Sequence, residues 1–212
     1  MNLQELGLGC GIAVAFAILL VVVVAAFAGG VYLVARRATL RRRAVWTETA
    51  AATGLRIEDD PVRPRMVGTV HGVEVTVDMP AQPHLHVRPE RFYRSWMAWT
   101  RVLAPLTRRA HVQVRPRGRT FGQKPLFRAT AFEDEELDRR YEVFADSRSA
   151  LDEALRPEVR NALRRAEPAV HLHPDRVVWA EPWIARDAHR LTGAVRSCAA
   201  VAAALVRETV EP

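Results

Sequence analysis

Four histidines have the spacing that could hold a metal ion. They form two pairs, each separated by one residue: His84 with His86, and His171 with His173. Alternate side chains of a β-strand point to the same face, so each pair could chelate one ion if its segment is a strand. A complete site would need a third ligand. The candidates for that ligand are His111 and Asp175. The competing interpretation, which we favour, is that these histidines are ordinary strand-edge residues, and we assign no metal ligand.

No other motif for catalysis or cofactor binding is complete. The segment from Gly118 to Lys124 is faintly similar to a phosphate-binding loop, but its spacing is wrong and Pro125 stands where Ser or Thr is required. Cys198 falls on an apolar repeat, where a buried and unreactive thiol is expected. The serines lack the elbow motif of serine hydrolases. The sequence therefore assigns no catalytic and no cofactor-binding residue, and we do not expect an enzyme.

Residues 88–128 form a strongly basic region. It contains many arginines and the only lysine, Lys124, against a single acid, Glu90. Aromatic residues lie among them: Phe92, Tyr93, Trp96, Trp99, Phe121 and Phe127. Such a region can bind nucleic acid through phosphates and stacking, or lie on anionic lipid head groups. Because the whole chain, with a net charge of +7, uses arginine almost to the exclusion of lysine, we favour a compositional bias. Anionic lipid is the next interpretation, and nucleic acid is the least favoured.

An uncharged apolar run extends from Leu8 to Ala35. As a helix its roughly 28 residues would measure about 42 Å, which exceeds the ~30 Å hydrocarbon core of a bilayer. Backbone polar groups in lipid must be satisfied within the segment, and a helix does this. We therefore predict a transmembrane helix over 1–35, and the lipid bilayer is the first expected partner.

The charges on either side of this run predict its orientation. Only Glu5 precedes it, whereas five arginines follow: Arg36, Arg37, Arg41, Arg42 and Arg43. The positive-inside rule then places the N-terminus outside and the following domain in the cytoplasm of a bacterium. The five arginines should also contact anionic head groups, at about 1 kcal/mol each. The alternative is signal-peptidase cleavage after Ala26-Phe27-Ala28, but the run continues apolar through Val31–Val34 and no positive charge precedes it.

A basic juxtamembrane helix is expected over 36–54, with Gly54 at its end. Residues 55–212 are then expected to form one α+β domain. Alternating valines predict a hairpin over 67–77 with His71-Gly72 at its turn. A second hairpin is expected over 169–181 around Pro174-Asp175. We expect antiparallel pairing, and a small barrel is one version of this architecture.

The helices of this domain are predicted from caps and periodicity. Two short helices are expected after residue 148, the first capped by Ser149 and the second beginning at Pro157. Glu133–Glu136 is interpreted as a solvated acidic turn. A long C-terminal helix over 187–209 follows from an apolar repeat with alternating steps of four and three. The repeat consists of Ile184, Ala188, Leu191, Val195, Cys198, Ala202 and Leu205.

One segment resembles a known group of proteins. An acidic turn is followed by Leu137–Phe144 and then by a short helix. Leu155-Arg156-Pro157 begins the next helix, which contains Leu163, and an apolar hairpin comes after it. In this order, Phe132–Glu181 resembles an uncharacterised bacterial family of membrane-anchored proteins, a domain of unknown function. The resemblance implies an α+β architecture, and it carries no catalytic residue.

Together these features predict a single-pass inner-membrane protein with a cytoplasmic interaction or scaffold domain that binds an unidentified protein. The alternatives are a metal-dependent enzyme that uses His84 and His86, or a binder of nucleic acid or anionic lipid through residues 88–128. The two cysteines, Cys10 and Cys198, lie far apart and predict no disulfide framework, which fits a reducing compartment.

Overall fold

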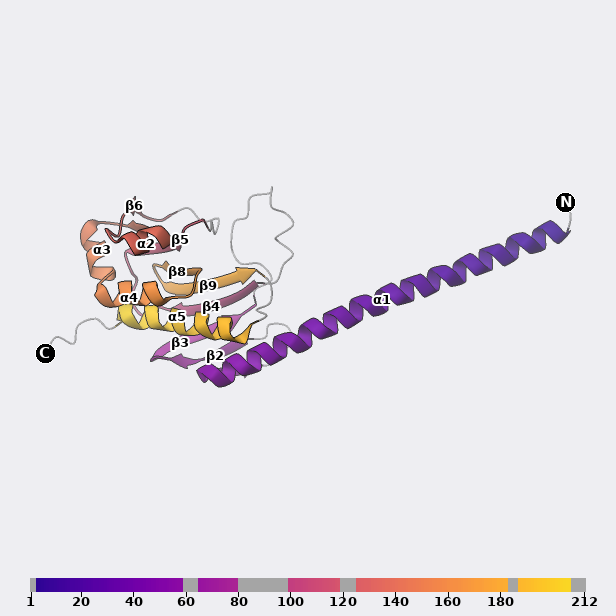
Figure 1. Ribbon diagram of the computed structural model, residues 1–212, viewed down its shortest axis with the longest axis horizontal. Helices are drawn as coiled ribbons and strands as arrows, with labels where there is room; N and C mark the ends of the chain where they lie inside the picture. The colour runs from indigo at the N-terminus through magenta and orange to yellow at the C-terminus, as the bar shows by residue number, and fades with distance from the viewer. Residues whose placement is uncertain (1–2, 59–64, 80–98, 119–124, 183–186, 207–212) are drawn as a thin grey trace. The chain divides into compact units, whose positions relative to one another are not determined.

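The computed structural model describes residues 3–58, 65–79, 99–118, 125–182 and 187–206. The chain divides into two compact units, Met1–Arg43 and Ala44–Pro212. The first unit is formed by most of one helix, and the second contains a nine-stranded sheet with the remaining helices (Figure 1).

Helix α1 (Leu3–Thr53) contains the apolar run and continues without a break through the arginine-rich segment. Every residue from Leu19 to Val34 is exposed, and Phe27 is 76% exposed. The helix is long and apolar enough to cross a membrane, with a mean hydropathy of 2.2 in its most apolar part. It ends before Gly54, whose φ of +75° is the left-handed conformation that glycine adopts most easily. The predicted helix and its stop are both confirmed.

The second unit is built on one antiparallel sheet in the order β1-β2-β3-β4-β9-β8-β5-β7-β6. The strands are β1 Arg56–Glu58, β2 Arg65–Val70, β3 Val73–Asp78, β4 Trp99–Pro105, β5 Val112–Pro116, β6 Arg128–Thr130, β7 Tyr141–Ala145, β8 Val170–His173 and β9 Arg176–Pro182. The predicted hairpins are β2–β3 and β8–β9. Among the described strands, β1 and β6 are the two edges and do not pair with each other, so this sheet is open and the barrel version of the prediction is wrong.

The alternation of side chains gives the sheet one apolar face. Across four neighbouring strands the register aligns Val77, Val102, Trp179 and Val170, all fully buried. Period-two alternation places such residues on the same side of the sheet, where they form one continuous core.

Helix α5 (Ala188–Val206) covers this face and contacts β2, β3, β4, β8 and β9 (Figure 1). The predicted apolar repeat is confirmed, because Leu191, Val195, Cys198 and Ala202 are all fully buried. Ile184 lies outside the described residues. Many of the other buried residues of α5 are alanines, whose small side chains allow the helix backbone to approach the strands.

The described part of the domain has three short helices before α5, not two: α2 Glu135–Arg140, α3 Arg148–Ala154 and α4 Pro157–Arg165. The acidic segment Glu133–Glu136 is not a turn, because it leads into α2, where the Asp134 carboxylate accepts a hydrogen bond from the Leu137 amide. Helix α3 is capped by Ser147, not by Ser149, and the Ser147 hydroxyl accepts from the Ala150 amide at 3.1 Å. The sequence of α2 has no apolar periodicity that would predict a helix, because Leu137 is the only buried residue of this helix.

Arginines satisfy carbonyl groups that helix ends leave free. Arg140 donates to the carbonyls of Arg164 and Ala166 at the end of α4, the latter at 2.8 Å. Arg160 donates to Leu155 at the end of α3 at 2.7 Å, and Arg196 donates to Ala52 near the end of α1 at 3.0 Å. Part of the high arginine content therefore has a structural role.

We expect Leu191→Ala to lower the free energy of unfolding by about 2–5 kcal/mol, because it leaves a cavity between α5 and the sheet. Leu126→Ala removes the same atoms from a side chain that is 64% exposed and should cost under about 0.5 kcal/mol. Denaturant unfolding of the full chain in detergent, followed by tryptophan fluorescence, measures both. Equal losses in the two variants would contradict the assigned core.

Candidate functional site

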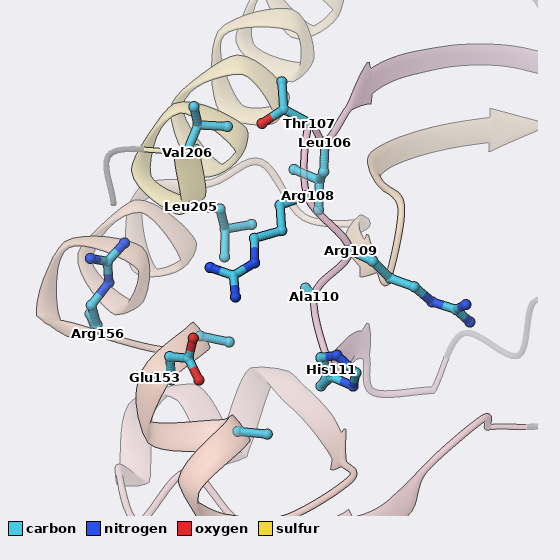
Figure 2. Close-up of a pocket in the computed structure, with 12 residues that line it drawn as sticks. Leu106, Thr107, Arg108, Arg109, Ala110, His111, Glu153, Arg156, Leu205 and Val206 are labelled. Carbon is cyan, nitrogen blue, oxygen red and sulfur yellow. The ribbon is translucent and has the colours of Figure 1, made fainter. Parts of the chain in front are cut away.

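A cavity of about 270 Å³ lies between the β4–β5 connection, α3 and the end of α5 (Figure 2). One part of its wall is apolar and consists of Leu106, Ala110, Ala150, Ala154, Leu205 and Val206. The polar part consists of Thr107, Arg108, Arg109, His111, Glu153 and Arg156. These residues come from three separate stretches of the sequence, so only the fold brings them together.

The β4–β5 connection, residues 106–111, is held by backbone hydrogen bonds at both ends. The Leu106 amide donates to the Asp175 carbonyl at 2.9 Å, and the Ala110 amide donates to the Pro174 carbonyl at 2.7 Å. The Asp146 amide donates to the His111 carbonyl at 3.2 Å. Because the β8–β9 turn and the end of β7 fix this connection, the cavity is formed before any ligand enters it.

The charged side chains of the cavity have different orientations. In Figure 2 the guanidinium of Arg108 points into the cavity, whereas that of Arg109 points away from it. Arg156 donates to the Ala204 carbonyl near the end of α5 at 3.4 Å. Glu153 is the one carboxylate among the twelve residues that line the cavity. The lining therefore combines an apolar wall with an excess of guanidinium groups.

A second hollow, of about 400 Å³, lies over α4 and α5. Its floor consists of small residues: Ala162, Ala166, Ser197, Ala200, Ala203 and Ala204. Arg165, Arg196, Glu158, Asn161 and His71 lie around it. Arg196 already caps α1, and the other charged residues are exposed, so this hollow has no charged group directed inward from a fixed position.

The histidine pairs do not form a metal site within the described residues. His171 and His173 share one face of β8, with ring centroids 6.1 Å apart, as the alternation predicted. Burial and the charges of Arg176 and Arg115, opposed by Asp175, lower the pKa of His173 to about 4. The same positive charges disfavour a bound cation. Among the described residues no group of three His, Cys, Asp or Glu could hold a metal, and His84 and His86 lie outside them.

Several arginines of the basic region have partners inside the fold. Arg101 donates to the Asp78 carboxylate through two nitrogens, with 2.9 Å between Nε and Oδ1. The Arg115 guanidinium lies 5.4 Å from the centre of the Phe144 ring, and Arg117 donates to the Asp138 carbonyl. These three are not available as a continuous surface for phosphates. Residues 88–98 and 119–124 lie outside the described residues.

Cys198 is fully buried beneath the sheet, as its place in the apolar repeat predicted. Burial raises the pKa of its thiol well above the usual range, and a hydrogen bond with the Trp179 backbone opposes this only partly. A thiol in this environment is not a nucleophile at neutral pH.

No family model matches this chain, and no curated protein matches it. Among solved structures, the chain is similar to the crystal structure of the mycobacterial trehalose monomycolate transport factor A, TtfA. The two sequences are 11% identical, and the match covers 78% of this chain and 94% of that chain with a TM-score of 0.49. The resemblance of Phe132–Glu181 to a bacterial family stays a prediction.

The environment of His173 predicts a stability that depends on pH. The pKa is about 4 in the folded state against 6.5 for an ordinary histidine, so between these values the unfolded chain binds more protons. Stability should therefore fall as the pH drops from 6.5 to 4, by up to about 3 kcal/mol from this residue alone.

Thermal unfolding of the full chain across this pH range tests the prediction. His173→Gln should show a smaller loss of Tm on acidification than the original chain does. The matched control is His189→Gln, on an exposed position of α5, which should keep the original dependence. An unchanged pH profile in His173→Gln would contradict the assigned environment.

Proposed function

We propose that this protein is a single-pass protein of the bacterial inner membrane whose cytoplasmic domain is an interaction or scaffold domain and not an enzyme. The observation that carries the proposal is the unbroken exposed apolar surface of α1 from Leu19 to Val34. A soluble protein rarely exposes such a surface, whereas a bilayer covers it with lipid chains.

The arginines that follow this surface support the proposed orientation. Arg36, Arg37, Arg41, Arg42 and Arg43 lie within about three turns of its end, and of these Arg36, Arg37, Arg41 and Arg43 are exposed. Positive residues close to a transmembrane helix are retained on the cytoplasmic side. Anionic head groups at that surface would attract them.

The domain itself supports a binding role more than a catalytic one. Its one described cysteine is buried and protonated, and its acidic residues are largely engaged by arginines. Examples are Glu133 with Arg148 at 2.7 Å, Glu135 with Arg139 at 2.7 Å, and Asp134 with Arg164. Carboxylates held in such ion pairs are less available to act as general acids or bases.

Topology is the first test. A fluorescent protein that folds only in the cytoplasm, fused after Pro212, should be bright, and a periplasm-active phosphatase at the same place should be inactive. The matched control replaces all five arginines by glutamine and should weaken this bias. Phosphatase activity with a dark fluorescent fusion would overturn the orientation and favour cleavage after Ala28.

The second test concerns lipid. Native mass spectrometry of the full chain, released from mixed micelles, should detect more bound phosphatidylglycerol than phosphatidylcholine. The five-glutamine variant should lose this preference, because each arginine near the surface contributes about 1 kcal/mol. Arg139→Gln, a change of charge on exposed α2, is the control and should retain the preference. Equal retention of both lipids by the original chain would contradict the role of the arginines.

A further inference from the structure

We propose that the hollow over α4 and α5 is the surface through which two copies of this chain form a dimer, with α4 of one copy antiparallel to α4 of the other. Glu158 of each copy then pairs with the partner's Arg165. This inference goes beyond the proposed function, because it names a second copy as the partner and does not depend on the orientation of α1.

The hollow is a groove between two helices. Helices α4 and α5 pack against each other (Figure 1), and the lining of the hollow has helical spacing on both. The lining residues that recur at steps of three and four are Glu158, Ala162 and Arg165 on α4, and Ser197, Ala200 and Ala204 on α5. This spacing places each series on one face of its helix. A groove formed by two such faces is a surface on which another helix can lie.

The floor of the groove consists of small side chains. Ala162, Ser197, Ala200 and Ala204 are all partly buried, so they cover the helices without projecting far from them. Small residues at a contact let two helix axes approach to about 8 Å, the short end of the usual range. The face of α4 that borders the groove is small as well, because it carries Ala162 and Ala166. Helix α4 of a second copy therefore matches the groove in size.

The charges at the rim favour a second copy over another partner. Glu158 and Arg165 are exposed, and neither forms an ion pair or a side-chain hydrogen bond with any residue of the described ranges. They lie seven residues apart, which is about two turns on one face of α4. In an antiparallel pair with its twofold axis midway between them, close to Ala162, each carboxylate lies opposite the partner's Arg165. The rim is thus complementary to itself.

The two parts of this surface have different roles in the proposed dimer. Covering the alanines of the floor removes apolar surface from water and favours association. Exposed ion pairs contribute little to affinity, but opposite charges select the partner and fix the register. A helix with acidic residues along its whole length would meet Glu158 as a like charge, whereas α4 of a second copy meets no like charge at either end.

Disulfide cross-linking in isolated membranes tests the contact. The full chain carries Cys10→Ser, and its other cysteine, Cys198, is fully buried. Ala162→Cys places a thiol close to the proposed axis and should give a cross-linked dimer on oxidation with copper phenanthroline. The matched control is Ala129→Cys on the exposed strand β6, which should cross-link about fivefold less or weaker still. Equal cross-linking of the two variants would overturn the proposal, as would absence of a dimer in Ala162→Cys.

Charge reversal in the Ala162→Cys chain tests the pairing. Glu158→Arg and Arg165→Glu should each lower the cross-linked fraction about fivefold or more, because each sets like charges opposite each other twice. The double variant restores opposite charges and should return to within about twofold of the parent. Arg109→Glu, an exposed change of the same charge on the β4–β5 connection, should have no effect. Circular dichroism of the purified chains checks that each variant is folded.

Other ways of filling the groove or of joining two chains give different results. If α1 alone held two copies together, the single charge reversals would leave the cross-linking unchanged. If a different protein filled the groove, Ala162→Cys would give no dimer of this chain. Either result, or a double variant that stays as low as the single ones, would overturn the assignment of a second copy. None of these results alters the reporter test of orientation, so the two proposals can fail separately.

Discussion

The domain depends on covering one face of a wide antiparallel sheet. The aligned row of Val77, Val102, Trp179 and Val170 gives this face a continuous apolar surface, and α5 lies across it. Because the residues of α5 that face the sheet are largely small, helix and strands pack closely at many positions. The smaller helices then complete the cover at the other end of the sheet, where α4 packs on α5 and α2 packs on α4.

This packing of short helices also affects where charged side chains are needed. A layer of several short helices produces many helix ends, and each end leaves carbonyl groups without partners. Arg140, Arg160 and Arg196 supply donors to such groups, and the long guanidinium side chain reaches across from a neighbouring element. The abundance of arginine, which looked compositional in the sequence, is thus partly a structural requirement of the helical layer. Arg108 has a different position, because its guanidinium points into the cavity beside the β4–β5 connection.

Local patterns in the sequence predicted the local elements of the fold. The β2–β3 hairpin follows from alternating valines on both sides of His71-Gly72, and α5 follows from its apolar repeat, since both signals lie within about twenty residues. The pairing of β4 with β9 and of β5 with β8 could not be predicted in this way, because a strand pattern does not specify a distant partner. The cavity was missed for the same reason. Arg108 and Arg109 are adjacent in the connection between β4 and β5, but nothing in the local sequence pattern indicates that α3 and the end of α5 lie opposite.

The position of the β8–β9 hairpin has a consequence for the order of folding. It lies between β4 and β5, so the centre of the sheet is completed by residues 170–182, which the ribosome synthesises late. Until then β4 and β5 have no neighbour on their inner edges, and the apolar face lacks α5. Contacts so distant in the chain make folding slow, because a long loop must close before they form. The sheet therefore cannot be completed until residues 170–182 have been synthesised, and until then its unpaired strand edges are open to association with other chains.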